Sequence, residues 1–255
     1  MKFMNSEISD SYNFAKRMKG NHNPNMIMDR EDWEIFRDDL RGKLGEIAVR
    51  NYIIDKAPDS VIETDIDFSV TGRGQWDIVD LVVNGIHLSV KSIRQQSKFL
   101  LVESKRYDDD GNYVYNNNDG QKVRIDYYVL VRVKIHPEVT KASFEQKYDD
   151  FLNKAWDGKS KREVKREFEA QVLGAISHDD FWSKKKYAPK GIKCSVKNLS
   201  ALTESKSNTL NQWPDPLLET DSKNHILQQD NFVINGESQL ALLENELLKA
   251  KLIIY

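Results

Sequence analysis

The dipeptide Asn84-Gly85 constrains the fold of this chain more than any other feature, because it lies between two runs of β-forming residues. Both positions tolerate the positive φ angles that a two-residue hairpin turn requires. A turn of this length also fixes how the two strands pair. Residues 80–83 are therefore expected to pair, in reverse order, with residues 86–89.

The two faces of this hairpin differ in polarity. Side chains alternate along a strand, so the apolar face is expected to point into the core. It carries Val79, Leu81, Val83, Ile86, Leu88 and Val90. The other face sets Asp80 opposite Ser89, with Lys91 two residues further on. A carboxylate beside an ammonium suits phosphodiester hydrolysis, which needs a cation site and positive charge near the phosphate.

Regular elements are expected on both sides of the hairpin. From Glu31 onward, apolar residues recur at helical spacing, which predicts a half-buried helix. Strands are expected at residues 61–70, 77–83, 86–93, 99–103 and 123–135, and a further helix at 142–158. The next segment fits two structures. It is either a helix from Lys161 behind a capping box of Ser160 and Glu163, or a strand with alternating apolar residues from Phe168 to Gly174.

Composition divides the chain into three parts. Residues 1–30 are polar and rich in asparagine, which predicts an arm or loop, and residues 31–212 form the main domain. A C-terminal extension, 213–255, begins at a proline-containing stretch and ends in a helix expected at 237–252. The leucines of that helix either contact a second subunit or pack on their own domain. They are Leu240, Leu243, Leu247 and Leu248.

The charge of the chain is nearly balanced. Its 255 residues include 38 Lys+Arg and 40 Asp+Glu, so the net charge is −2. That balance argues against a broadly basic coat for nucleic acid. Locally the charges separate, because residues 108–110 are all aspartate while residues 181–197 hold six lysines and no acid. A specific DNA enzyme needs only a local positive surface around its site.

Several classes of protein are excluded. The single cysteine, Cys194, rules out a disulfide scaffold and a cysteine-rich zinc site, and it is compatible with the reducing cytoplasm. The five histidines lack the spacing of zinc ligands. No apolar run is long enough to cross a membrane, and the first residues lack the apolar core of a signal peptide. We therefore expect a cytoplasmic protein that does not bind a membrane.

The motif around the hairpin resembles the PD-(D/E)xK nuclease superfamily, and within it the type II restriction endonucleases. The resemblance rests on Gly45-Glu46 in a helix, Asp80 on a strand, the Asn-Gly turn, and Ser89-Val90-Lys91 on the next strand. It covers about residues 40–135 and extends more weakly to 200. It implies an α/β/α core around a central mixed sheet of about five strands. It also implies Mg²⁺-dependent hydrolysis of double-stranded DNA at a short specific sequence, by a homodimer.

The resemblance also implies roles for individual residues. Asp80 becomes the metal-binding aspartate, Lys91 the catalytic lysine and Glu46 the helix acid that accompanies many members. The carbonyl of Val90 is the expected backbone ligand. Ser89 departs from the pattern, because it stands beside the metal where the family usually has Asp or Glu.

Two assignments stay open at this stage. Glu46 and Glu103 are both candidates to supply the acid that Ser89 lacks. Asp77 competes with Asp80 as the metal aspartate, although the hairpin register places Asp77 on the core side.

Six residues are candidates for contact with DNA. Arg73, in a loop flanked by glycines, is placed to meet a phosphate or a groove. Gln95 and Gln96 follow the catalytic strand and carry the amide that reads adenine edges. Lys184, Lys185 and Lys186 interleave with aromatic residues as phosphate-binding surfaces do, or form an ordinary solvated face.

Two rival functions remain. One is a nuclease of the same fold directed to branched or damaged DNA. The other is a DNA-binding or interaction module whose active site has decayed, for which Ser89 is the best argument.

Overall fold

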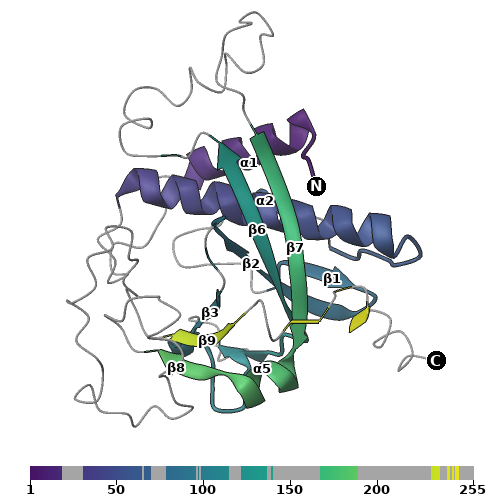
Figure 1. Cartoon of the computed structure of the whole chain (residues 1–255), viewed down its shortest axis with the longest axis vertical. Helices are drawn as coiled ribbons and strands as arrows, with labels where there is room; N and C mark the ends of the chain where they lie inside the picture. The colour runs from purple at the N-terminus through teal and green to yellow at the C-terminus, as the bar shows by residue number, and fades with distance from the viewer. Residues whose placement is uncertain are drawn as a thin grey trace, which may run out of the picture.

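The computed structural model describes most of the N-terminal two thirds of the chain and short parts of the rest. The described residues are 1–18, 31–64, 66–69, 79–95, 97, 99–114, 122–136, 139, 167–188, 231–235, 240, 241, 243, 245 and 246. In this part of the chain the fold is mixed α/β, with three α-helices and a mixed sheet of four strands (Figure 1). The helix expected at 142–158 and the capping box at Ser160 lie outside it.

The long helix α2 (Asp32–Lys56) confirms the helical pattern that begins at Glu31. The backbone N–H of Glu31 donates to Oε2 of Glu34, at 3.4 Å, so the first turn is capped by its own side chains. Twelve of its 25 residues are buried, which is more than one face of the helix. The helix is therefore covered by other elements along much of its length.

The N-terminal arm expected over residues 1–30 contains a helix, α1 (Asn5–Met18). Its buried residues recur at spacings of three and four along the chain, and the polar majority lies on the opposite face. Ala15 and Met18 are 0% and 5% exposed, and Tyr12 meets Phe36 of α2 edge-on with ring centroids 5.4 Å apart. The expectation of a loop was wrong because it weighed polar composition above the spacing of the few apolar residues.

The main sheet has the strand order β1-β2-β6-β7. The strands are β1 (Leu81–Val83), β2 (Ile86–Ile93), β6 (Tyr127–His136) and β7 (Glu167–Ser177). β1 and β2 are antiparallel, β2 and β6 parallel, and β6 and β7 antiparallel. The predicted hairpin register is confirmed, and the turn residues Asn84 and Gly85 have φ angles of 50° and 75°.

The described sheet is one strand smaller than expected. Residues 61–70 were expected to form a strand, yet the described residues there make only an isolated bridge from Ile62 to Val83. Ile62 and Ile66 pack against the core, whereas Glu63 and Thr64 between them are exposed. Two apolar residues bury too little surface to hold a longer strand against the sheet edge.

Two smaller sheets lie beside one end of the main sheet. One joins β3 (Phe99–Glu103), β9 (Asn231–Asn235) and β8 (Lys186–Ala188), and the other joins β4 (Tyr113–Val114) and β5 (Lys122–Val123). A 3₁₀ turn, η1 (Ser104–Arg106), follows β3, and the short helix α5 (His178–Lys184) follows β7. The ambiguous segment from Phe168 to Gly174 is therefore strand.

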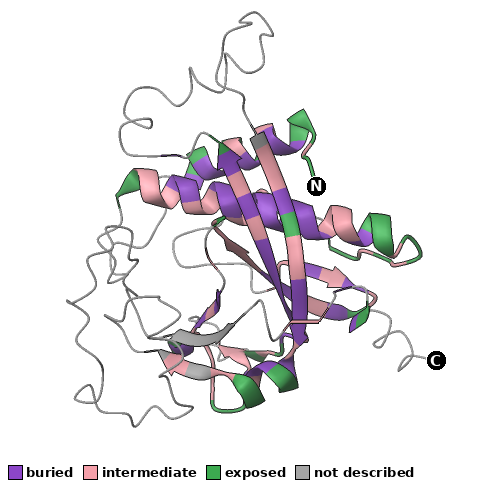
Figure 2. Cartoon of the chain, in the orientation of Figure 1, coloured by how far each residue is buried: buried purple, intermediate pink, exposed green. Residues whose placement is uncertain are grey.

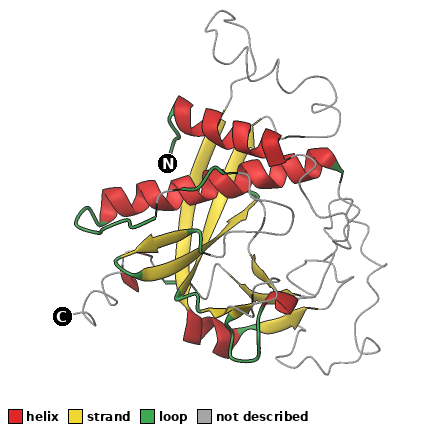
Figure 3. Ribbon diagram, turned by 180° about the vertical axis from the view of Figure 1, so that it is seen from behind, coloured by secondary structure: helices red, strands yellow, loops and turns green. Residues whose placement is uncertain are grey.

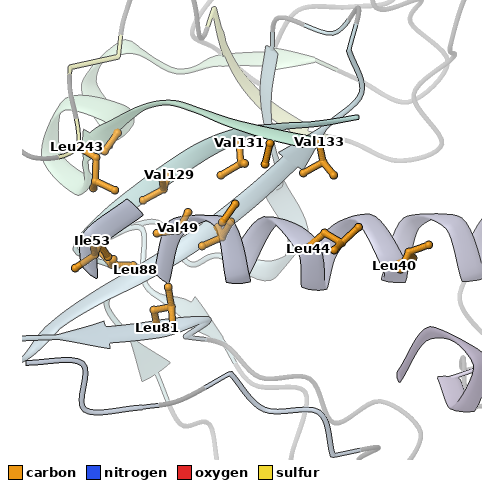
Figure 4. Packing of buried hydrophobic residues seen from close by; sticks show 14 of the residues in the cluster. Leu40, Leu44, Val49, Ile53, Leu81, Leu88, Val129, Val131, Val133 and Leu243 are labelled. Carbon is orange, nitrogen blue, oxygen red and sulfur yellow. The ribbon is translucent and has the colours of Figure 1, made fainter. Parts of the chain in front are cut away.

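Helices α1 and α2 cover one face of the main sheet, as both views of the molecule show (Figure 1, Figure 3). The buried residues form a main core between α2 and the sheet (Figure 2, Figure 4). It includes Leu40, Leu44, Val49, Ile53, Leu81, Leu88, Val129, Val131 and Leu243. The apolar hairpin face, Val79 excepted, thus points into the core as predicted, and the helix that covers it is α2.

A second core lies on the other face, between the main sheet and the smaller elements. Its buried residues are Leu100, Val102, Ile125, Tyr128, Leu130, Ile176 and Phe181. Val79 packs here, although the alternation placed it in the main core. Strand β1 begins only at Leu81, so the alternation does not extend back to Val79. Since α5 contributes Phe181, helices flank both faces of the sheet.

The C-terminal extension packs on its own domain where it is described. Leu243 is 1% exposed in the main core, and Leu240 packs against the second core. Ala241 and Ala175 of β7 exchange two backbone hydrogen bonds, of 2.9 and 2.8 Å. Leu247 and Leu248 lie outside the described residues. None of the described helices has the length and apolar character needed to span a lipid bilayer.

Candidate active site

The hairpin pairing continues one residue beyond β1 and sets Asp80 opposite Ser89. The N–H of Asp80 donates to the carbonyl of Leu88 at 3.0 Å. The carboxylate then turns toward β2, where its Oδ2 accepts hydrogen bonds from Val90 N–H at 2.6 Å and Ser89 Oγ at 3.2 Å. In this way the side chain takes the place of a strand partner for Val90. Both bonds go to Oδ2, so Oδ1 is left for a cation or water.

Lys91 lies on the same face as Ser89, two residues further along β2. It is half-buried beside Leu130 of β6, its partner in the strand register. Within the described part of the chain, Lys91 takes part in no ion pair, and its ammonium is not held by Asp80. A cation of this kind is available to an anionic ligand.

Two tyrosines that no sequence motif marks lie at this face, Tyr128 on β6 and Tyr107 in the loop after η1. Tyr128 is the register neighbour of Ser89 on β6, and it is fully buried. Tyr107 packs against Tyr128 with ring centroids 6.3 Å apart. The many turn residues of segment 107–120 predict a solvated loop, yet Tyr107 and Tyr113 pack in the second core. Only the tertiary packing of this loop places Tyr107 near Asp80.

Both tyrosines stay protonated at neutral pH. Burial raises the pKa of Tyr128 to about 12. Burial also raises the pKa of Tyr107 well above its usual value of 10.0, and nearby Tyr128, Tyr113 and Asp80 raise it further. Groups of this kind donate hydrogen bonds and do not act as bases.

Glu46 lies on α2 and is buried, but the structure pairs it with its own helix. Its Oε2 is 2.7 Å from Nζ of Lys43, which also lies 4.9 Å from the ring centroid of Phe14. Next to it, Gly45 packs so closely on β2 that a Cβ there would overlap Ser92 Oγ. Helix α2 therefore sits on the face of β2 that carries Ser92, opposite to the face of Ser89 and Lys91.

The structure does not assemble a set of acidic ligands around Asp80. Among the described residues, no group of three or more His, Cys, Asp or Glu side chains is placed to hold a metal ion. Glu103, the other candidate acid, has its Oε2 3.2 Å from Nε of Arg106. Asp77 lies outside the described residues. Which acid accompanies Asp80 stays open, and the metal role of Glu46 stays a prediction.

Two of the three candidate DNA-binding lysines are engaged within their own segment. Lys184 lies 3.0 Å from Oδ1 of Asp180 on α5. Lys185 donates to the carbonyl of Trp182 at 3.0 Å, and its ammonium lies 4.5 Å from the centroid of that ring. Lys186 begins strand β8.

The other candidate DNA contacts are only partly described. Gln95 is exposed just beyond β2, close to Lys91 in the chain. Arg73 and Gln96 lie outside the described residues. Of these three residues the structure therefore describes Gln95 alone.

Comparisons with known proteins found no relative that could assign a role to these residues. No protein-family model, curated protein or solved structure matches the chain.

Proposed function

We propose that this chain is a Mg²⁺-dependent endonuclease that hydrolyses double-stranded DNA, at a short specific sequence in the manner of a type II restriction enzyme. One observation carries the proposal. The hairpin register sets Asp80, Ser89 and Lys91 on one face, with the Asp80 carboxylate oriented by two hydrogen bonds to β2.

The donor set suits magnesium better than zinc. Mg²⁺ keeps several waters and takes phosphate oxygens from its substrate, so one or two carboxylates suffice to bind it. Zinc needs three or four protein ligands, which the described residues do not offer here. Asp80 would hold the ion through Oδ1. Glu103 is the proposed second acid in preference to Glu46, because Glu46 is paired with Lys43 on a helix that packs on the other face of β2. When bound, Mg²⁺ supplies positive charge to the phosphate and makes a water more acidic.

The residues of the chain itself have separate roles. Ser89 and the N–H of Val90 fix the orientation of the Asp80 carboxylate. The ammonium of Lys91 offsets the negative charge that builds up on the phosphate during attack. Since Tyr107 keeps its proton, it can donate a hydrogen bond on this face without competing as a base.

A plasmid assay tests the proposal. Purified protein with Mg²⁺ is expected to convert plasmid DNA into discrete fragments. Lys91→Ala should lower the cleavage rate by at least about 100-fold, because it removes charge stabilisation that acts in the transition state. Its binding to DNA in Ca²⁺ should persist. Lys56→Ala is the matched control, because that lysine is exposed at the end of α2.

Other outcomes favour the rival functions. Nicks that depend on branches or lesions would favour a nuclease directed to DNA structure or damage. Binding without cleavage in Mg²⁺ or Mn²⁺, on phage DNA and on branched DNA, would favour a decayed module. The serine at position 89 and the lack of an assembled acidic cluster among the described residues are the observations that support the decayed module.

A homodimer is part of the proposal for cleavage at a palindromic site. Two identical active sites related by a two-fold axis cut both strands of such a site. Cleavage of both strands in a single binding event would support this arrangement.

A further inference from the structure

The face of the sheet that carries Lys91 continues onto strand β6. Val131 and Val133 of β6 point into the main core, so Arg132 and Lys134 point to the opposite face. Ile93 is the register partner of Arg132. Arg132 is therefore the diagonal neighbour of Lys91 on the adjacent strand, and Lys134 lies one step further along the same row.

This part of the face is open among the described elements. Helices α1 and α2 lie behind β6 and β7 in Figure 1, and no described helix or strand lies in front of the upper half of these strands. Gln171, the register partner of Arg132 on β7, is exposed. The smaller sheets and α5 cover the other end, around Tyr128. The cations thus lead away from Asp80 along a part of the sheet in front of which no described helix or strand lies, although the Nε of Arg132 is itself buried.

The contacts of Arg132 orient its guanidinium on this face. It donates to Oε1 of Gln171 and to the carbonyl of Ser97, both at 3.4 Å. Both acceptors are uncharged, and the two bonds orient the guanidinium along the sheet face. Lys134 and Glu169 form a long ion pair of 3.8 Å, and the side chain of Glu169 is 43% exposed. Such exposed pairs are weak and exchange readily for another anion.

We infer that Lys91, Arg132 and Lys134 form a track that binds the phosphate backbone of one DNA strand as it leaves the active site. Alternate residues of a strand lie about 7 Å apart, so the three cations can each meet a separate phosphate of one strand. The inference rests on the proposed function, because that function places the cleaved phosphate beside Asp80 and Lys91. It assigns the backbone contact to the sheet face and not to the lysines of α5.

The charges of the surrounding segments favour the sheet face over the lysine run. The ion pair of Lys184 with Asp180, at 3.0 Å, is closer than the 3.8 Å pair of Lys134 with Glu169, although it is also exposed. Lys185 lies over the ring of Trp182, and Asp179 is exposed nearby. On the described part of the sheet face, Glu169 and Asp80 are the acids that face the track. Asp80 lies at its end, where the cation would bind, and Glu169 is weakly paired.

The salt dependence of DNA binding tests the track. The affinity of each variant for a labelled duplex is measured in Ca²⁺ over a range of salt concentrations. Each phosphate contact contributes about 0.9 to the slope of log affinity against log salt. Arg132→Gln with Lys134→Gln should therefore reduce the slope by about 1.8, and Lys134→Gln alone by about half of that.

The matched control makes the same change in charge at the other end of β6. Lys122→Gln with Arg124→Gln removes two exposed cations, each of which forms one ion pair, with Asp108 and Asp179 respectively. Its slope should equal that of the native chain. Thermal unfolding of every variant checks that the fold is retained. If the Arg132 variant fails to fold, the slope of Lys134→Gln alone still tests the track.

Cleavage in Mg²⁺, measured in parallel, separates this inference from the proposed function. If the native chain cleaves DNA but the track variants keep its slope, the inference is wrong and the proposed function stands. A reduced slope without native cleavage would support the track and contradict the enzyme. A lower slope for Lys184→Gln with Lys185→Gln, without any effect at Arg132 and Lys134, would move the contact to α5.

Discussion

At the scale of single residues, the charge of Asp80 can be separated from its hydrogen bonds. Asp80→Asn keeps an oxygen that accepts from Val90 N–H, but it removes the charge that a cation needs. We expect cleavage to fall by at least about 100-fold, because the metal would no longer be held. The free energy of unfolding should change by about 1 kcal/mol or less. Cleavage kinetics and urea unfolding measure the two effects.

Asp126→Asn is the matched control for Asp80→Asn. Oδ2 of Asp126 accepts the N–H of His87 at 2.8 Å, so it holds β2 by a carboxylate hydrogen bond as Asp80 does, but near the first residue of the strand. This variant should cleave at the native rate. Equal losses of cleavage in both variants would mean that each acid only supports the strand.

The hairpin residues of the site could be predicted because a two-residue turn fixes every pair that follows it. The positions of Asp80, Ser89 and Lys91 on one face follow from Asn84-Gly85 alone. Tyr107 could not be placed in the same way, because its position depends on the fold of a loop between distant strands. The pairing of Glu46 with Lys43 was also out of reach, since helical spacing alone does not show which neighbour a buried acid meets.

At the scale of elements, the contact of α2 with β2 sets the position of the helix behind the active-site strand. Gly45 allows the closest approach, because any Cβ there would overlap Ser92 Oγ. Gly45→Ala should lower the free energy of unfolding by about 1–3 kcal/mol through overpacking. Urea unfolding measures this cost.

Gly42 supplies the control for Gly45 within the same helix. A Cβ at Gly42 would meet nothing within 4 Å, so Gly42→Ala should stabilise the chain, by up to about 1 kcal/mol. Replacing Ser92 by glycine in the Gly45→Ala background should recover part of the loss. If both alanine variants were equally stable, α2 would not lie this close to β2.

Elements with a strong local signal were predicted well, and those that depend on weak patterns were not. Strands β2 and β3 have the predicted bounds, and α2 begins one residue after Glu31, where the helical pattern starts. Helix α1 was missed because few apolar residues mark its buried face. The strand expected at 61–70 reduces to a bridge in the described residues, since alternation alone does not supply a partner.

At the scale of the whole molecule, long-range pairings hold distant parts of the chain together. Strand β9 lies between β3 and β8, so residues 231–235 join segments that lie far apart in the sequence. No local pattern predicts such a pairing, because it depends on how the whole chain closes. The division into a main domain and a C-terminal extension stays a prediction, although the described residues of the extension contact both cores.

The burial of Leu243 gives a test of this integration. It is 1% exposed among main-core residues, so Leu243→Ala should lower the free energy of unfolding by about 2–5 kcal/mol. Ile54→Ala is the control, because Ile54 is 50% exposed on α2 and should cost about 1 kcal/mol or less. Unfolding of native protein and both variants is followed at several protein concentrations. If Leu243 packs within its own chain, the loss of unfolding free energy caused by Leu243→Ala will not depend on protein concentration. A cost that shrinks on dilution would instead assign this leucine to a contact between subunits.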